Sequence, residues 1–239
     1  MVRVPRARPA MTPRRWLVMM VKVPNAGRVK TRLARGIGTI PATGFYRHAV
    51  AGLANRLVNQ RRWTLVLAIA PSAEISSTAL PHVGVRVGQR AGNLGRRMQA
   101  IFDTLPNGPV LIIGSDVPGI SQSAVAGAFH MLEGADAVIG PSPDGGFWSI
   151  GLRRRPRCLR PFAKVRWSTE DALEGTLRNL ADRRVAFAPA MHDVDEADDL
   201  QRYVQRGRRI VAPDPTFAPI IAPDCSPAAL KRQRRATPP

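Results

Sequence analysis

The chain has 239 residues, of which 44% are hydrophobic and 22% charged, so it can bury a substantial core and wholesale disorder is excluded. Its two cysteines, Cys158 and Cys225, exclude a disulfide scaffold and a four-cysteine zinc site. No apolar run approaches the roughly 20 residues of a membrane span, and we expect a cytoplasmic protein.

The charge is strongly positive. The chain has 36 basic and 17 acidic residues, a formal net charge of +19, and only four of the basic residues are lysines. Both terminal stretches, 1–15 and 231–235, are basic and contain no acid. Aromatic residues make up 5% of the chain and do not alternate with the basic runs, as a base-stacking surface would require. The charge therefore favours attraction of anionic metabolites over specific binding of nucleic acid.

The predicted elements form one domain between two irregular ends. Residues 1–14 are rich in Pro and Arg and predict a disordered basic extension, in which Met11 is a second candidate start besides Met1. Residues 212–239, rich in Pro, Ala and Arg, predict a disordered tail. A single domain over residues 15–211 is expected between them.

Within this domain, short apolar runs typical of strands alternate with stretches of helical periodicity. The strands are expected at residues 16–21, 63–70, 83–87, 110–114 and 135–140, with an additional strand, of antiparallel direction, at 147–152. The helices are expected at residues 42–59, 94–105, 121–132, 169–180 and 196–205. This alternation predicts a doubly wound α/β fold with a mostly parallel sheet. Ligands of such sheets bind beyond the carboxyl ends of the strands, so the residues that follow each strand are the candidates for a site.

The first strand is followed by a loop, residues 22–33, that carries glycine, proline and several cations. Glycine lets the backbone approach an anion, and Lys and Arg side chains bind phosphate oxygens. Neither the P-loop pattern nor the dinucleotide-binding fingerprint is present, and a solvated basic loop is the alternative. The position after the first strand favours phosphate binding. The candidate residues are Lys22, Gly27, Lys30, Thr31 and Arg32.

The strand at 110–114 is apolar enough to be buried on both faces, and the sequence GSDVP begins at its last residue. Asp116 is therefore expected at the centre of the sheet's edge, facing the basic loop. A carboxylate there suits Mg²⁺ or Mn²⁺, which bind one or two carboxylates together with phosphate oxygens. The alternative role, capping the next helix, fits Ser121 better because Asp116 lies several residues too early.

Two further acidic segments leave a structural and a functional role open. Asp144 with Gly145 and Gly146 is either a turn into the next strand or a carboxylate beside a ligand that the glycines allow to approach closely. Asp195 is either a cap of the helix that follows or a second metal ligand. The neighbouring His192 is either structural or a base.

Six motifs occur in one order between residues 16 and 205: KVPNAGRVKTRL, QRAGNLGRRM, GSDVPG, GPSPDGGFWSIGL, VRWST and DVDEADDL. This series resembles a bacterial family of nucleotide-diphospho-sugar transferases, also described as GT-A-type glycosyltransferases and in part as radical-SAM-associated or arsenosugar-biosynthesis transferases. The resemblance implies the GT-A fold, a Rossmann-like sheet in a three-layer sandwich that nucleotidyltransferases also use.

The resemblance also implies roles for individual residues. The loop after the first strand would cradle the nucleotide. Asp116 would bind the metal, and Asp195 would make a second metal contact. The remaining residues that this series singles out are Gln89 and Asn93 for the nucleotide, and Asp144, Gly145, Gly146 and Trp167 for the acceptor or sugar.

The sequence departs from the family pattern in two places. Asn93 and Arg96 replace two acids of the second motif, and Ser115 precedes a single Asp116 where glycosyltransferases of the DxD type have two acids. The ending GxDxP is closer to guanylyl- and cytidylyltransferases of small metabolites.

Three functional hypotheses follow from these observations. The leading one is a transferase that uses a nucleoside diphosphate-sugar and Mg²⁺ or Mn²⁺ to glycosylate a small acceptor, with Lys30 stabilising the leaving diphosphate and Asp144 as the base. The alternative is a nucleotidyltransferase that joins a nucleoside triphosphate to a phosphorylated metabolite and releases pyrophosphate. The third is a non-catalytic protein that binds anions or nucleic acid through its arginines.

Overall fold

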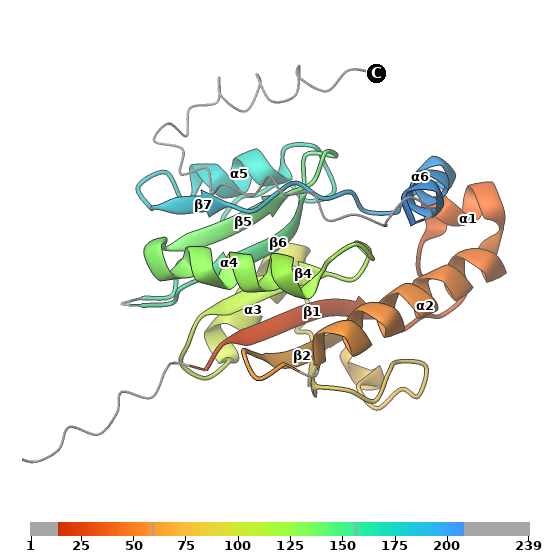
Figure 1. The fold of residues 1–239 in the computed structure, drawn as a ribbon, viewed down its shortest axis with the longest axis horizontal. Coiled ribbons are helices and arrows are strands. Elements are labelled where there is room, and N and C mark those ends of the chain that lie inside the picture. Colours follow the sequence, from red (N-terminus) through yellow and green to blue (C-terminus); the bar gives the residue numbers. More distant parts are fainter. Residues whose placement is uncertain (1–13, 59, 156, 208–239) are drawn as a thin grey trace, which may run out of the picture.

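The computed structural model describes residues 14–58, 60–155 and 157–207. The predictions for the two ends lie outside the described residues, as do Cys225 and the choice between Met1 and Met11. The described part forms three layers, a central sheet with helices on both faces (Figure 1). This confirms the predicted α/β sandwich.

The sheet has seven strands in the order β3-β2-β1-β4-β6-β5-β7. Their bounds are β1 Trp16–Lys22, β2 Thr64–Ala70, β3 Val85–Gly88, β4 Val110–Gly114, β5 Ala137–Pro141, β6 Phe147–Leu152 and β7 Val185–Phe187. Strand β6 runs antiparallel to both of its neighbours, and all other pairs are parallel, as the sequence predicts. Strand β7 is not among the predicted elements, because three residues are too few to show a periodicity.

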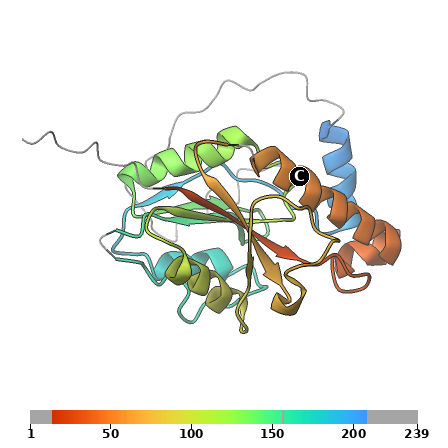
Figure 2. The same cartoon turned by 90° about the horizontal axis from the view of Figure 1, so that it is seen from below.

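Helices α2 and α4 cover one face of the sheet, and α3 and α5 cover the other (Figure 2). The helix bounds are α1 Thr31–Ile37, α2 Thr39–Val58, α3 Leu94–Thr104, α4 Gln122–Gly134, α5 Ala172–Arg178 and α6 Ala197–Gly207, with a short 3₁₀ helix at Ser72–Glu74. Helix α1 is a correction to the prediction, which treats residues 22–33 as one loop. The loop ends at Lys30, and Gly38 with a φ of 89° turns the chain between α1 and α2.

Strand β4 shows how the core holds the sheet in place. Its side chains alternate between the two faces, so Leu111 and Ile113 pack on the side of α2 and α4 while Val110 and Ile112 pack on the side of α3. All four are at most 2% exposed, as expected for a central strand of a doubly wound sheet. Among the described residues, none of the helices combines the length and the apolar character that a bilayer crossing demands.

The topology brings several motifs to one edge of the sheet. Strands β1, β3 and β4 are parallel within the sheet and end at the same edge. Because β6 is antiparallel to β4, its first residues lie at that edge too. The loops after β1, β3 and β4 and the turn before β6 are therefore neighbours, although more than a hundred residues separate the first from the last.

Candidate functional site

A cavity of about 330 Å³ lies at this edge of the sheet. Its walls come from β1, β4 and β6, from the loop before α1, from α2 and from α3. The predicted residues that line it are Lys22, Lys30, Gln89, Asp116 and Asp195. Residues 147–150 of the motif GPSPDGGFWSIGL line it too, so the structure brings together residues from five of the six motifs.

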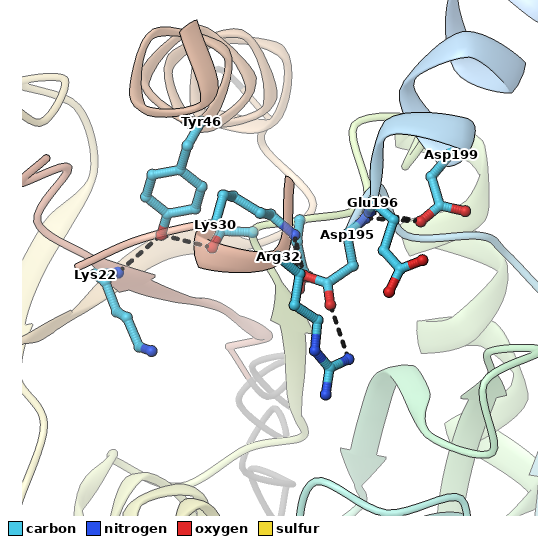
Figure 3. A network of polar contacts seen from close by, with 9 residues as sticks. Lys22, Lys30, Arg32, Tyr46, Asp195, Glu196 and Asp199 are labelled. Atoms are coloured by element: carbon cyan, nitrogen blue, oxygen red, sulfur yellow. Dashed lines mark hydrogen bonds and ion pairs between the residues drawn. The ribbon is translucent and has the colours of Figure 1, made fainter. Parts of the chain in front are cut away.

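Lys30 is the cation that joins the basic loop to the acids. Its backbone is in the left-handed region, with a φ of 47°, which a lysine adopts only where the surroundings hold it. Its side chain is 5% exposed, and its Nζ lies 3.6 Å from an Asp116 carboxylate oxygen and 3.4 Å from an Asp195 carboxylate oxygen. Arg32 reaches Asp195 from the solvent side, with its Nη1 at 3.0 Å (Figure 3). One buried ammonium therefore bridges the two predicted metal ligands.

Backbone contacts explain why these two acids meet. The N–H of Val194 donates to the carbonyl oxygen of Asp116 at 3.0 Å, which ties the segment before α6 to the loop after β4. The carboxylate of Asp199 accepts the N–H groups of Asp195 and Glu196 at 3.0 and 2.8 Å. Burial opposes the charge of Asp199, yet these two donors and Arg202 lower its pKa. Asp199 therefore caps α6, and the side chain of Asp195 is left to face Lys30.

Close packing of α1 on α6 supports the same arrangement. A Cβ at Gly36 would lie 2.8 Å from the Cβ of Ala197, at the start of α6. Glycine at this position lets the two helices approach, and their approach brings the loop that carries Lys30 toward Asp195.

Tyr46 of α2 fixes the ends of β1 and β4. Its hydroxyl accepts the N–H of Lys22 at 3.0 Å and lies 3.1 Å from the hydroxyl of Ser115. The ring is buried, and burial raises the pKa of the phenol. Sequence analysis misses this residue because it lies on the apolar face of a predicted helix, where a core role is the natural interpretation.

Asp193 interacts electrostatically with Lys30 and with three other carboxylates, and we call Asp116, Asp144, Asp193 and Asp195 the acidic cluster. The pKa of Asp193 is raised to about 6 by burial and by the charges of Asp116, Asp144 and Asp195, against a lowering by Lys30. Burial is the largest cause of this shift, and the neighbouring carboxylates add to it. Sequence analysis misses Asp193 because its surroundings come from distant parts of the chain.

The acidic cluster fits a divalent cation that shares its ligands with a substrate. Among the described residues, no group of three or more His, Cys, Asp or Glu side chains is arranged to hold a metal ion. Asp116 and Asp195 offer oxygen ligands, and their side chains are 43% and 33% exposed. Mg²⁺ and Mn²⁺ prefer such a site, with one or two carboxylates completed by phosphate oxygens and water.

The other predicted residues of the basic loop lie outside the cavity wall. Gly27 has a φ of 76°, and a Cβ there would meet open space, so glycine serves the turn rather than a close approach. Thr31 is the first residue of α1. Arg32 is exposed and paired with Asp195. Lys22 and Lys30 are the two cations of this loop that line the cavity.

Residues of the second motif, QRAGNLGRRM, form and position the part of the cavity wall that belongs to α3. Gln89 is buried, and its amide nitrogen donates to the carbonyl oxygens of Val21 and Ala68 at 3.2 and 2.7 Å. Its amide oxygen accepts Nη1 of Arg97 at 3.0 Å, and Arg97 lines the cavity. Asn93 does not; it caps α3 by accepting the N–H of Arg96 at 2.9 Å.

The segment Asp144-Gly145-Gly146 is a turn, one of its two predicted roles. Asp144 accepts the N–H of Gly146 at 3.0 Å. Gly145 has a φ of 85°, and a Cβ there would collide with the backbone of Glu170. Asp144 also belongs to the acidic cluster, so a role beside a ligand stays open. Trp167 packs edge-on against Phe147 and Phe162 and is not among the residues that line the cavity.

His192 lies at a second cavity, of about 430 Å³, that Asp193 also lines. This cavity lies between the loop after β4 and α6, with Arg56 and Tyr203 in its wall. Asp193 lines this second cavity with His192, whereas Lys30 lines the first. The predicted role of His192 as a base stays a prediction.

A mostly parallel sheet with a basic loop, a central carboxylate and a cavity at its carboxyl edge defines a class, the nucleotidyltransferase-like and GT-A-like α/β proteins. Residues 53–169 match the sequence profile of a family described as "Uncharacterized protein conserved in bacteria (DUF2064)". This match and the similarities that follow together confirm the predicted resemblance to a bacterial transferase family.

Two similar structures and one similar sequence extend this finding. A crystal structure from Desulfovibrio desulfuricans G20, provisionally described as a nucleotide-diphospho-sugar transferase, is 28% identical, covers 82% of this chain and 89% of its own, and has a TM-score of 0.74. The 2-phospho-L-lactate guanylyltransferase of Methanopyrus kandleri is 32% identical over 128 residues, which are 51% of this chain and 64% of that enzyme. The match thus spans less than two thirds of this relative. A nucleotidyl transferase from Methanothermobacter thermautotrophicus is 12% identical, with a TM-score of 0.58 over 82% of this chain and 98% of its own, and shows the fold alone.

Proposed function

We propose that the protein is a nucleotidyltransferase, which transfers a nucleoside monophosphate from a nucleoside triphosphate to a small phosphorylated acceptor and releases pyrophosphate. The observation that carries this proposal is the single carboxylate of Asp116 at the end of β4, bound to the buried ammonium of Lys30. The sequence similarity to a guanylyltransferase supports it. The alternative of the sequence analysis is thus better supported than its leading hypothesis of glycosyl transfer.

The reaction consists of one bond formed and one bond broken. A phosphate oxygen of the acceptor attacks the α-phosphorus of the triphosphate, and the bond from that phosphorus to the bridging oxygen breaks. The electron pair of this bond leaves with pyrophosphate. Negative charge builds up on the leaving group, so the protein's contribution is positioning and electrostatic stabilisation.

Lys22 and Lys30 are placed to meet this charge because both line the cavity beside the end of β1. Lys30 is held with 5% of its side chain exposed, so little solvent screens its charge and it does not reorganise during the reaction. Its Nζ exchanges part of its contact with the acids for a phosphate oxygen when the triphosphate binds.

Asp116 and Asp195 would hold Mg²⁺ or Mn²⁺ together with phosphate oxygens. The ion would neutralise phosphate charge and polarise the reacting phosphoryl group. The residues of the chain then have separate tasks. Lys30 and Arg32 hold Asp195 in place, and Asp199 fixes the backbone that carries it.

The two transfer reactions place different demands on Asp144. An acceptor phosphate is already an anion, and its attack requires no base. A sugar acceptor that attacks through a hydroxyl group requires one, and Asp144 is the predicted base. The similarity to the Desulfovibrio protein favours glycosyl transfer as the second candidate function.

The products distinguish the two reactions. We would incubate the protein and Mg²⁺ with each nucleoside triphosphate and a panel of phosphorylated hydroxy acids, and in parallel with nucleoside diphosphate-sugars, GTP being the first triphosphate tested. We expect pyrophosphate from one triphosphate only when an acceptor is present. Release of a nucleoside diphosphate from a sugar donor, with no pyrophosphate from any triphosphate, would replace this proposal by the second candidate.

A further inference from the structure

Arg97 differs from the other half-buried arginines of the described chain in the number of partners it has. Arg86 donates to four backbone carbonyl oxygens, and Arg154 donates to three. Arg153 pairs with the carboxylate of Asp136. Arg97 has one hydrogen-bond partner, the amide oxygen of Gln89, and its Nε is buried without any. The Nε atoms of Arg153 and Arg154 also lack a partner, but a carboxylate or three carbonyl oxygens hold each of these guanidinium groups, whereas Arg97 has a single neutral amide.

The surroundings of Arg97 make this lack of partners costly. The guanidinium lines the cavity beside the apolar side chains of Leu94, Met98, Ile112 and Phe147. No carboxylate of the described residues lies within ion-pair distance of it. Removing a cation from water without a counter-ion costs free energy, and burial lowers the pKa of Arg97 accordingly.

Gln89 holds the guanidinium in this position. Its amide nitrogen is fixed by two carbonyl oxygens, of Val21 and Ala68, so the amide cannot flip and its oxygen must face Arg97. The contact uses one of the five N–H groups of the guanidinium and leaves its planar fork available. A buried glutamine with no freedom of orientation thus aims a cation at the cavity.

We propose that Arg97 is an anion-binding residue of the cavity, which takes a phosphate or carboxylate group of a substrate, and that Gln89 positions it. The bidentate fork of arginine matches the oxygens of such a group. The proposal rests on the proposed function in that the anion is part of the triphosphate or of the phosphorylated acceptor. It adds a subsite on the α3 side of the cavity. This subsite carries a positive charge without a counter-ion, whereas the acidic cluster is negatively charged.

Ser149 is a second residue of the cavity wall with an unpartnered polar group. It lines the same cavity, is 1% exposed, and its hydroxyl has no hydrogen-bond partner among the described residues. A buried hydroxyl is normally satisfied. The cavity wall thus holds two polar groups without partners, which a polar ligand in the cavity would satisfy.

The test compares Arg97→Met with Arg96→Met by titration calorimetry. Arg96 is the adjacent residue of the same helix and is exposed, so it controls for the loss of one positive charge. The probes are inorganic pyrophosphate, GTP with Mg²⁺, and 2-phosphoglycolate as a small phosphorylated acid. Each is titrated alone, so that no turnover is needed.

We expect Arg97→Met to weaken the binding of at least one probe by about 10- to 100-fold, as the loss of one charge-assisted hydrogen-bonding group does, and Arg96→Met to leave all three unchanged. A loss for pyrophosphate and GTP assigns the subsite to the nucleotide, and a loss for phosphoglycolate alone assigns it to the acceptor. Equal affinities of Arg97→Met and the wild type for every probe that the wild type binds would overturn the proposal, as would failure of all three probes to bind the wild type.

A second measurement separates ligand binding from a structural role. Without ligand, we expect Arg97→Met to melt no lower than the wild type, because the variant loses an unmatched buried cation rather than a satisfied one. Arg97→Lys keeps the charge and should retain part of the anion affinity. A lower melting temperature of Arg97→Met with unchanged anion binding would show that the residue is structural. Anion binding that depends on Arg97 in a protein that makes no pyrophosphate would support the subsite and refute the proposed function.

Discussion

Lys30 and Arg97 line the same cavity, but only Lys30 has acidic partners. Lys30 lies between Asp116 and Asp195 at 3.6 and 3.4 Å, whereas Arg97 contacts a neutral amide. On the side of Lys30 the acids outnumber the cations, and on the side of Arg97 a cation lacks an anion. A ligand that carries both a divalent cation and phosphate oxygens would correct both imbalances. The cavity is therefore charged in a pattern that a metal-bound nucleotide complements.

The largest effect on turnover is expected from the substitution of Asp116 in the acidic cluster. Asp116→Ala removes one of the two proposed metal ligands and one of the partners of Lys30, and turnover should fall about 100- to 1,000-fold, as for the loss of one stabilising group. Chelation of the metal should have a comparable effect on the wild type. Steady-state pyrophosphate release measures both, and Asp182→Ala, at an exposed position, is the matched control. Full turnover of Asp116→Ala would remove the metal site from the mechanism.

Replacing Lys30 instead of Asp116 tests the same part of the cavity through its cation. Lys30→Met should reduce turnover by about 100-fold, because a preorganised buried charge is lost. It should also raise the pKa of Asp193 further, since Lys30 is among the charges that lower it. The carboxyl NMR signal of Asp193 reports this pKa directly. Arg35→Met, an exposed cation in the last turn of α1, should change neither quantity, and an unchanged pKa in Lys30→Met would contradict the placement of the ammonium.

The burial of Asp193 and the charges around it should appear in the pH dependence of stability. The pKa of Asp193 is about 6 in the folded chain against an ordinary value of 3.8, so between these values the folded state binds more protons than the unfolded state. Ionisation of Asp193 therefore lowers the free energy of unfolding as the pH rises through this window, and the loss is complete above about pH 6.

Asp193→Asn should remove this dependence. The melting temperature of the variant relative to the wild type should rise between pH 4 and pH 7 in the absence of metal. Thermal unfolding at intervals of half a pH unit measures it, with Asp182→Asn as the control. A difference between variant and wild type that is constant over this range would show that Asp193 ionises as it does in water.

The smallest effect on turnover is expected at Asp144. Under nucleotidyl transfer Asp144 adds to the field on Asp193 but is not needed as a base, and Asp144→Asn should change the rate by less than about threefold. Its contact with the N–H of Gly146 survives, because the amide oxygen of asparagine still accepts a hydrogen bond. A loss of 100-fold or more would favour hydroxyl activation and hence glycosyl transfer.

The sequence predicts much of the fold because the strands are short, apolar and spaced by amphipathic helices. The mostly parallel sheet, the antiparallel β6 and the cap of α4 at Ser121 are all as predicted. Helix α1 and strand β7 are missed because each is too short for a pattern and is fixed by contacts with distant residues, such as that of Gly36 with Ala197.

The candidate site is predicted where it depends on position after a strand. Asp116 and Lys30 follow strands that the sequence reveals, and Asp195 follows from the last motif. Arg97 and Asp193 do not follow from any pattern, because their importance comes from their surroundings. The lack of partners at Arg97 depends on the orientation of Gln89, and the raised pKa of Asp193 depends on its burial and on charges that include the distant Asp116 and Asp144.

The proposed reaction is tested most directly by following GTP, Mg²⁺ and a phosphorylated acceptor with ³¹P NMR as the protein acts on them. We expect the signal of pyrophosphate to grow together with that of a new diphosphate linkage, in equal amounts, and to be absent with Asp116→Ala. If neither signal grows with any nucleoside triphosphate, while a nucleoside diphosphate-sugar is converted to the free nucleoside diphosphate, the protein is not a nucleotidyltransferase.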